Sequence, residues 1–166
     1  MTRSSIRLVV ALALLASSAP AEAKRKGGGA IPRAMLRKVY FSKPPIKNAE
    51  LSRLVSRFKG AKAHASLVRD ARKEWKVNMV AFFRKKSFPG PITIWVYDKA
   101  DKASIKAKEP VHVISVNASP TRAFVHELFL DANVGFNKNH TYLVQVGQLI
   151  KRRARIYASG ELELKK

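Results

Sequence analysis

The sequence predicts a mainly β fold, and three observations lead to this prediction. From Trp75 to the C-terminus, apolar residues alternate with other residues at the period of a strand. Six such segments follow one another at spacings of about ten residues. Turn signals separate them without intervening helical patterns, and parallel strands would need long crossovers. We therefore expect a small antiparallel β-sandwich of immunoglobulin-like or related topology, with about six to seven strands and one or two N-terminal helices.

The first 23 residues have the three-part layout of a secretory signal peptide. Arg3 and Arg7 charge the amino end, an apolar run follows from Leu8 to Ala16, and Ala21-Glu22-Ala23 is a small-residue cleavage pattern. The apolar run is shorter than the roughly 20 residues that a membrane-spanning helix needs. We therefore expect cleavage near Ala23 and a periplasmic or secreted protein.

A basic arm and a helical segment are expected to precede the strands. Residues 24–30 begin with three cations, continue with three glycines, and are predicted to be disordered. In the N-terminal segment 31–74, an apolar stretch at 39–41 is consistent with an edge strand. An amphipathic helix is predicted over 49–59, because its apolar residues recur at i, i+3, i+4 and i+7: Leu51, Leu54, Val55 and Phe58.

The ends of this helix are also marked in the sequence. Asn48 is the expected N-cap, Glu50 is expected in the first turn, and Arg57 and Lys59 in the last. The spacing of apolar residues over 61–74 is compatible with a second helix.

The region 75–166 is expected to hold the sandwich, and 31–166 to form one domain. Strands are expected at 75–84, 92–97, 111–116, 123–130, 141–146 and 153–164, with a crossing loop over 98–110. The last strand alternates most regularly. Ala154, Ile156 and Ala158 are expected on one face, with Arg153, Arg155 and Tyr157 on the other.

Composition adds a strong positive charge. The chain has 33 Lys and Arg against 11 Asp and Glu, a net charge of +22, and no cysteine. Removal of residues 1–23 takes two of the 33 and one of the 11, which leaves 31 against 10. Such a charge attracts polyanions and anionic surfaces, although a merely solvated lysine-rich surface is the alternative. The lack of cysteine excludes disulfides, thiol catalysis and cysteine-ligated zinc.

Three basic clusters are the candidate anion-binding residues. Two arginines of the last strand share a face about 6.6–6.8 Å apart, and arginine binds phosphate or carboxylate through two hydrogen bonds. A second cluster tops a hairpin loop, and the N-terminal arm supplies a third. The candidates are Lys24, Arg25, Lys26, Arg84, Lys85, Lys86, Lys151, Arg152, Arg153 and Arg155.

Catalytic and cofactor motifs are not found in the sequence. The four histidines are scattered, and His126-Glu127 does not begin a zinc-protease motif because Leu130 stands where the second histidine is required. No nucleophile elbow or phosphate-binding glycine loop is present. Lysines interleave the acidic loop after Tyr97 and would repel a metal ion. We therefore expect no metal and no cofactor.

These observations predict an exported, strongly basic, non-enzymatic binding or structural domain. Its expected partner is an anionic envelope component or an acidic protein; nucleic acid is less favoured, because most aromatic residues occupy core positions. Two alternatives stay open. One is an assembly module that pairs with another protein through a sheet edge. The other is an unrecognised extracytoplasmic hydrolase, which needs a pocket that gathers His112 or His126 with a carboxylate.

Overall fold

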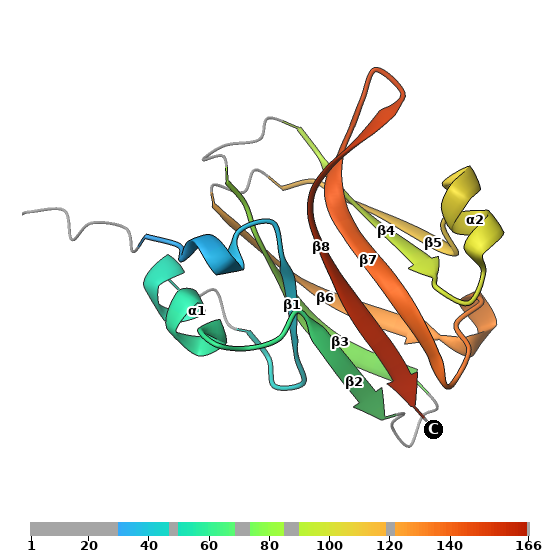
Figure 1. Cartoon of the computed structure of the whole chain (residues 1–166), viewed down its shortest axis with the longest axis horizontal. Helices are drawn as coiled ribbons and strands as arrows, with labels where there is room; N and C mark the ends of the chain where they lie inside the picture. Colours follow the sequence, from blue (N-terminus) through green and yellow to red (C-terminus); the bar gives the residue numbers. More distant parts are fainter. Residues whose placement is uncertain (1–29, 47–49, 69–73, 85–89, 119–121, 166) are drawn as a thin grey trace, which may run out of the picture.

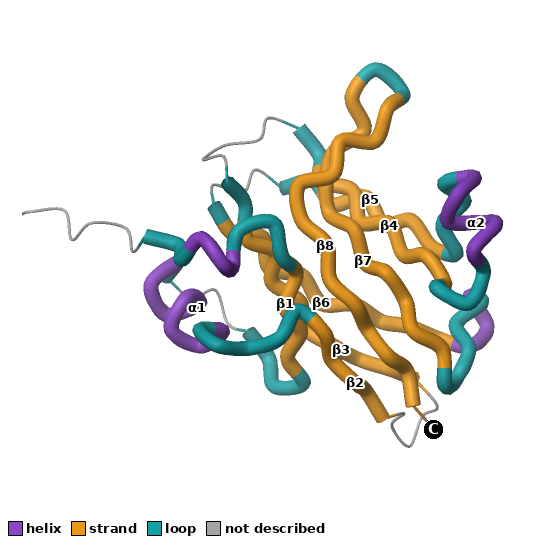
Figure 2. The backbone as a smooth tube through the Cα atoms, viewed as in Figure 1, coloured by secondary structure: helices purple, strands orange, loops and turns teal. Residues whose placement is uncertain are grey.

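The computed structural model describes residues 30–46, 50–68, 74–84, 90–118 and 122–165. It shows a mainly β protein with eight strands in two packed sheets (Figure 2). Sheet A has five strands in the order β2 (His64–Val68), β8 (Arg153–Lys165), β7 (His140–Ile150), β4 (Ile92–Asp98) and β5 (His112–Val116). Sheet B has three, in the order β1 (Val39–Ser42), β3 (Glu74–Phe82) and β6 (Ala123–Asp131). The predicted small β-sandwich is confirmed, with eight strands instead of the expected six to seven, and its immunoglobulin-like identity stays a prediction.

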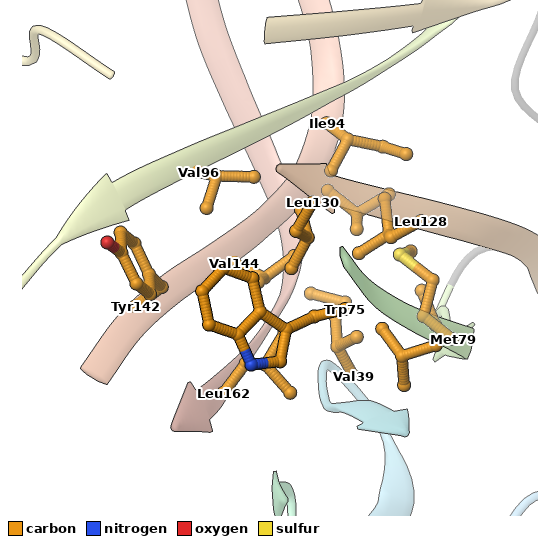
Figure 3. Packing of buried hydrophobic residues seen from close by; sticks show 14 of the residues in the cluster. Val39, Trp75, Met79, Ile94, Val96, Leu128, Leu130, Tyr142, Val144 and Leu162 are labelled. Atoms are coloured by element: carbon orange, nitrogen blue, oxygen red, sulfur yellow. The ribbon is translucent and has the colours of Figure 1, made fainter. Parts of the chain in front are cut away.

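The main core lies between the sheets, where the predicted alternation places it. Trp75 and Met79 of β3 face residues of sheet A such as Ile94 and Val144 (Figure 3), and all four side chains are at most 1% exposed. Burial of each large apolar side chain contributes roughly 1.5–3 kcal/mol. The Trp75 indole also donates a hydrogen bond of 3.0 Å to the carbonyl oxygen of Lys165. This bond ties the start of β3 to the end of β8.

Strand β8 joins the two sheets along one edge. The Ser159 N–H donates to the Arg37 carbonyl, and the Glu161 N–H donates to the Ala63 carbonyl. Gly160 lies between them and has no side chain, which lets β1 approach, because a Cβ there would overlap the Val39 carbonyl oxygen. The β8 edge therefore contacts first the start of β1 and then β2.

A second core lies on the outer face of sheet B, under helix α1 (Leu51–Phe58). Leu54 and Phe58 of α1 are buried with Val80 and Phe82 of β3, so the residues at the end of β3 are covered on both sides. The amphipathic helix is confirmed. Its N-cap, however, is Glu50 and not Asn48, which lies outside the described residues.

Local structure differs from the sequence interpretation in two places. A second helix was considered over 61–74, but residues 64–68 form strand β2. This strand pairs parallel with β8 and buries Leu67. The predicted crossing loop 98–110 contains the short helix α2 (Lys102–Ala107), capped by Asp101, whose carboxylate accepts a hydrogen bond of 3.0 Å from the Ser104 N–H. Strand β2 forms because β8, a partner distant in sequence, pairs with it. Helix α2 forms where Asp101 supplies a local N-cap, which favours the start of a helix.

A β-bulge reverses the expected facing of the last strand. Val146 pairs with Ala158, but Gly147 pairs with Ile156, so Tyr157 is an extra residue of β8. A bulge moves the following side chains to the other face of the sheet. Tyr157 therefore packs against the main core, and Ile156 faces outward on the side of Gly147. The expected shared face of Ile156 and Ala158 is wrong for this reason.

Candidate anion-binding site

Segments distant in sequence meet at one end of the sandwich, where β3 ends and β8 begins (Figure 1). The Phe83 and Tyr157 rings pack edge to face with centroids 6.1 Å apart. The Tyr157 hydroxyl donates to the Gln148 side-chain oxygen at 3.0 Å. The Gln148 amide nitrogen lies 3.4 Å and 3.5 Å from the carbonyl oxygens of Gly90 and Pro91. Both ends of the β3–β4 connection therefore contact the β7–β8 hairpin or its base.

These contacts gather cations. Arg84 follows Phe83, and Arg155 pairs with Gln148 in the hairpin. The Phe83 N–H also donates to the Arg122 carbonyl at 2.8 Å, and the Arg37 N–H donates to the Phe82 carbonyl at 2.8 Å. We call this end of the sandwich the basic end. Its described cations are Arg37, Lys38, Arg84, Arg122, Lys151, Arg152, Arg153 and Arg155.

Most cations of the basic end are exposed to solvent. Seven are exposed and Arg122 is half-buried. The ion pairs between described residues lie elsewhere, for example Lys76 with Glu127 at 3.1 Å and Lys99 with Glu161 at 2.6 Å. Like charges that lie close together raise the local positive potential, which attracts a polyanion in solution.

The structure brings part of the predicted set together. Arg84 follows Phe83, which packs on Tyr157, and so lies at the same end of the sandwich as Lys151, Arg152, Arg153 and Arg155. The other candidates, Lys24, Arg25, Lys26, Lys85 and Lys86, lie outside the described residues.

Sequence reasoning missed Arg37, Lys38 and Arg122. They fall outside the three predicted clusters, and only strand pairing brings them to the basic end. No local signal in the sequence marks them.

The turn of the β7–β8 hairpin places two cations in left-handed backbone. Lys151 has φ 50° and Arg152 has φ 63°. A two-residue hairpin turn with positive φ at both positions favours Asn-Gly, because most residues with longer side chains are strained in this backbone conformation. Strained backbone often accompanies a functional site.

The opposite end of the sandwich carries most of the described carboxylates: Glu74, Asp98, Asp101, Asp131, Glu161 and Glu163. They act within the fold. Buried Asp98 accepts from the Ala100 N–H at 2.9 Å and lies 2.6 Å from the Nδ1 atom of His140. The hydrogen bond from Lys99 lowers the pKa of Glu161 below its ordinary value, although burial acts in the opposite direction; the charges of Lys99 and His64 lower this pKa further.

A groove with a mixed polar and apolar lining, which the sequence did not predict, lies on the outer face of sheet A. It runs between α2 and the base of the β7–β8 hairpin and has a volume of about 230 Å³. Lys108 is the charged residue of its lining, and it caps α2 with φ 60°. The lining consists of Tyr97, Ile105, Lys108, Leu143, Gln145, Ala154 and Ile156.

The hydrolase hypothesis requires His112 or His126 to share a pocket with a carboxylate, and among the described residues these two histidines lie in different sheets. His112 of sheet A packs against Phe136, and His126 of sheet B stacks on Phe124. Burial lowers the pKa of His126, partly offset by Glu127. Neither histidine lines the groove, and the hydrolase stays a hypothesis.

The described residues contain neither a metal-binding cluster nor a membrane-spanning helix. Within the described residues, no group of three or more His, Asp or Glu side chains is placed to hold a metal ion. None of the helices in that part of the chain combines the length and apolarity of a membrane span.

Comparison of the chain with known protein families, with curated protein sequences and with solved structures gives no match.

Proposed function

We propose that the basic end binds an anionic surface or polymer, as part of a binding or structural domain that carries out no chemistry. The observation that carries this proposal is the packing of Phe83 on Tyr157, which brings the neighbouring Arg84 to the same end of the sandwich as the hairpin cations, although more than 60 residues separate them in the chain. Such a gathering of like charge is unfavourable without an anionic partner, and an anionic partner converts it into attraction.

Geometry supports a polyanion over a single small anion. The cations come from the start of β1, the end of β3, the start of β6 and the β7–β8 hairpin, so they span the end of the sandwich. Arg153 and Arg155 share one face of the hairpin, at a spacing of about 6.6–6.8 Å. A ligand with repeated phosphate or carboxylate groups can contact several of these cations at once.

The proposed partner is an anionic component of a cell envelope, or an acidic protein. It follows from the export signal predicted over residues 1–23, which lie outside the described residues. In this proposal the protein acts in the periplasm or outside the cell, and the arm at 24–30 adds charge to the basic end.

A salt-elution experiment tests the proposal. The double variant Arg153→Gln/Arg155→Gln should elute from an anionic matrix at lower salt than the wild type, with its circular dichroism unchanged. The matched control is Lys59→Gln/Lys62→Gln, which removes the same charge from exposed sites away from the basic end.

The control should elute close to the wild type. Equal losses in both double variants would show that net charge alone governs retention, and would refute a localised site. For a phosphate polymer, each lost contact should reduce the slope of log affinity against log salt by about 0.7–0.9.

A second candidate function, assembly through a sheet edge, rests on β5. This strand ends sheet A and pairs on one side with β4 within the described chain, and Val113 on it is 48% exposed. Another protein could add a strand there. A protein partner that stays bound in high salt, and is lost on Val113→Pro, would favour this candidate.

A further inference from the structure

The β7–β8 hairpin is amphipathic beyond its bulge. Leu149 pairs with Ala154, and Gly147 pairs with Ile156, so these four residues share the outer face. Arg153 and Arg155 lie on the other face. Leu149 is 62% exposed and Ile156 is 39% exposed. The hairpin extends beyond the rest of the fold (Figure 1), so its apolar face is open to a partner.

The apolar face of the hairpin continues into the groove. Ala154 and Ile156 belong to both, and Leu143 and Ile105 extend the apolar surface toward α2. Single exposed apolar residues are ordinary on a protein surface, but a continuous apolar patch marks an interaction site.

Cations border this patch. Lys151 and Arg152 lie at the hairpin turn, Lys108 lines the groove, and α2 carries the exposed Lys102 and Lys106. The occupant must therefore be both apolar and anionic. A second copy of the chain is disfavoured, because a net charge of +22 opposes its approach.

We propose that this patch docks onto the interfacial layer of an anionic phospholipid bilayer. Leu149 and Ile156 enter the boundary between headgroups and acyl chains, while the long side chains of Lys151 and Arg152 reach back to the lipid phosphates. Each cation near an anionic leaflet adds about 1 kcal/mol of attraction. This inference rests on the proposed function, because it names the anionic partner.

Tryptophan emission tests the docking at one site. In the full chain, Leu149→Trp places an indole on the patch, while the native Trp75 and Trp95 are 1% and 7% exposed and should not respond. The emission of the variant should shift to shorter wavelength with phosphatidylglycerol vesicles, and stay unchanged with phosphatidylcholine alone. The control is Val68→Trp, because Val68 is 57% exposed at the opposite end of sheet A.

A second variant separates apolar docking from charge. Leu149→Ser/Ile156→Ser should weaken binding to phosphatidylglycerol vesicles about tenfold or more, since two apolar contacts are lost. Its binding to inorganic polyphosphate should equal that of the wild type. All variants keep the same chain ends, so any lipid binding by residues 1–29 is common to them.

The outcomes distinguish the two proposals. If the Leu149→Trp emission does not shift while the wild type still binds vesicles and polyphosphate in a salt-dependent manner, bilayer docking is refuted and anion binding stands. If the wild type binds neither vesicles nor polyphosphate, the proposed function fails together with this inference.

Discussion

The two ends of the sandwich differ in how their charged residues are engaged. Left-handed backbone occurs at both ends, at Gly135 and Asn139 of the opposite end and at Gly90 of the basic end, residues that suit it. At the basic end Arg37, Lys151 and Arg152 also adopt it, with φ between 50° and 64°, as Lys108 does at the end of α2. Carboxylates at the opposite end are engaged in caps and ion pairs, whereas the ion pairs between described residues leave out the cations of the basic end. Residues at the opposite end thus serve the fold, and cations at the basic end are available to a ligand.

The largest expected effect comes from the glycine that positions the hairpin. A Cβ at Gly147 would overlap the Arg155 carbonyl oxygen at the bulge. Gly147→Ala should therefore lower the free energy of unfolding by about 3 kcal/mol, as measured by urea denaturation. Ser115→Ala, on an exposed site of β5, is the control and should change it little. An unchanged Gly147→Ala variant would mean that the bulge is not fixed by this contact.

A somewhat smaller loss of stability is expected at the opposite end. Asp98→Ala removes the acceptor of the Ala100 N–H and the partner of His140. We expect a loss of about 2 kcal/mol in the free energy of unfolding, with elution from the anionic matrix in salt unchanged or slightly later. Earlier elution of the folded variant would contradict the division of roles between the two ends.

At the basic end, a stabilising change should weaken binding. Lys151→Asn/Arg152→Gly gives the hairpin the turn residues that positive φ favours. The free energy of unfolding should rise by about 1 kcal/mol, while elution from the anionic matrix moves to lower salt. A variant that gains stability and keeps full retention would remove both turn cations from the site.

The smallest effect concerns Glu161 and its bond to Lys99. The pKa of Glu161 is lower in the folded protein, so its contribution to stability is present above its ordinary pKa of 4.5 and is lost as pH falls through the folded-state pKa. The pair is about 40% exposed, so Glu161→Gln should cost about 0.5 kcal/mol at pH 7. Urea denaturation at pH 7 and pH 3 measures the difference between wild type and variant. An equal difference at both values would show that the carboxylate charge is not its source.

Sequence reasoning found the strands other than β2, because the evidence for them is local. The apolar residues of β3 alternate, and Trp75, Met79 and Phe83 are buried on one side as expected. The sequence also has an unbroken apolar run from Val80 to Phe83, as expected for a strand end that is buried on both sides. Only the structure shows that helix α1 covers the second side of this strand end.

The candidate site was predicted in part, for a related reason. Arg153 and Arg155 form a cluster in the sequence and in the structure. Arg37 and Arg122 joined them only through the pairing of β1 and β6 with β3. The apolar patch was missed because strict alternation along the last strand places Ile156 on the same face as the core residue Ala158. The extra residue of the bulge, Tyr157, turns Ile156 outward.

The sequence by itself determined the mainly β class, the core faces of most strands and the positive charge, because side-chain period and composition belong to neighbouring residues. The tertiary structure decided the parallel pairing of β2 with β8, the bulge at Tyr157 and the convergence of cations at the basic end. These features depend on hydrogen bonds and packing between segments far apart in the chain. Such contacts form only when the sheets assemble, so no local pattern encodes them.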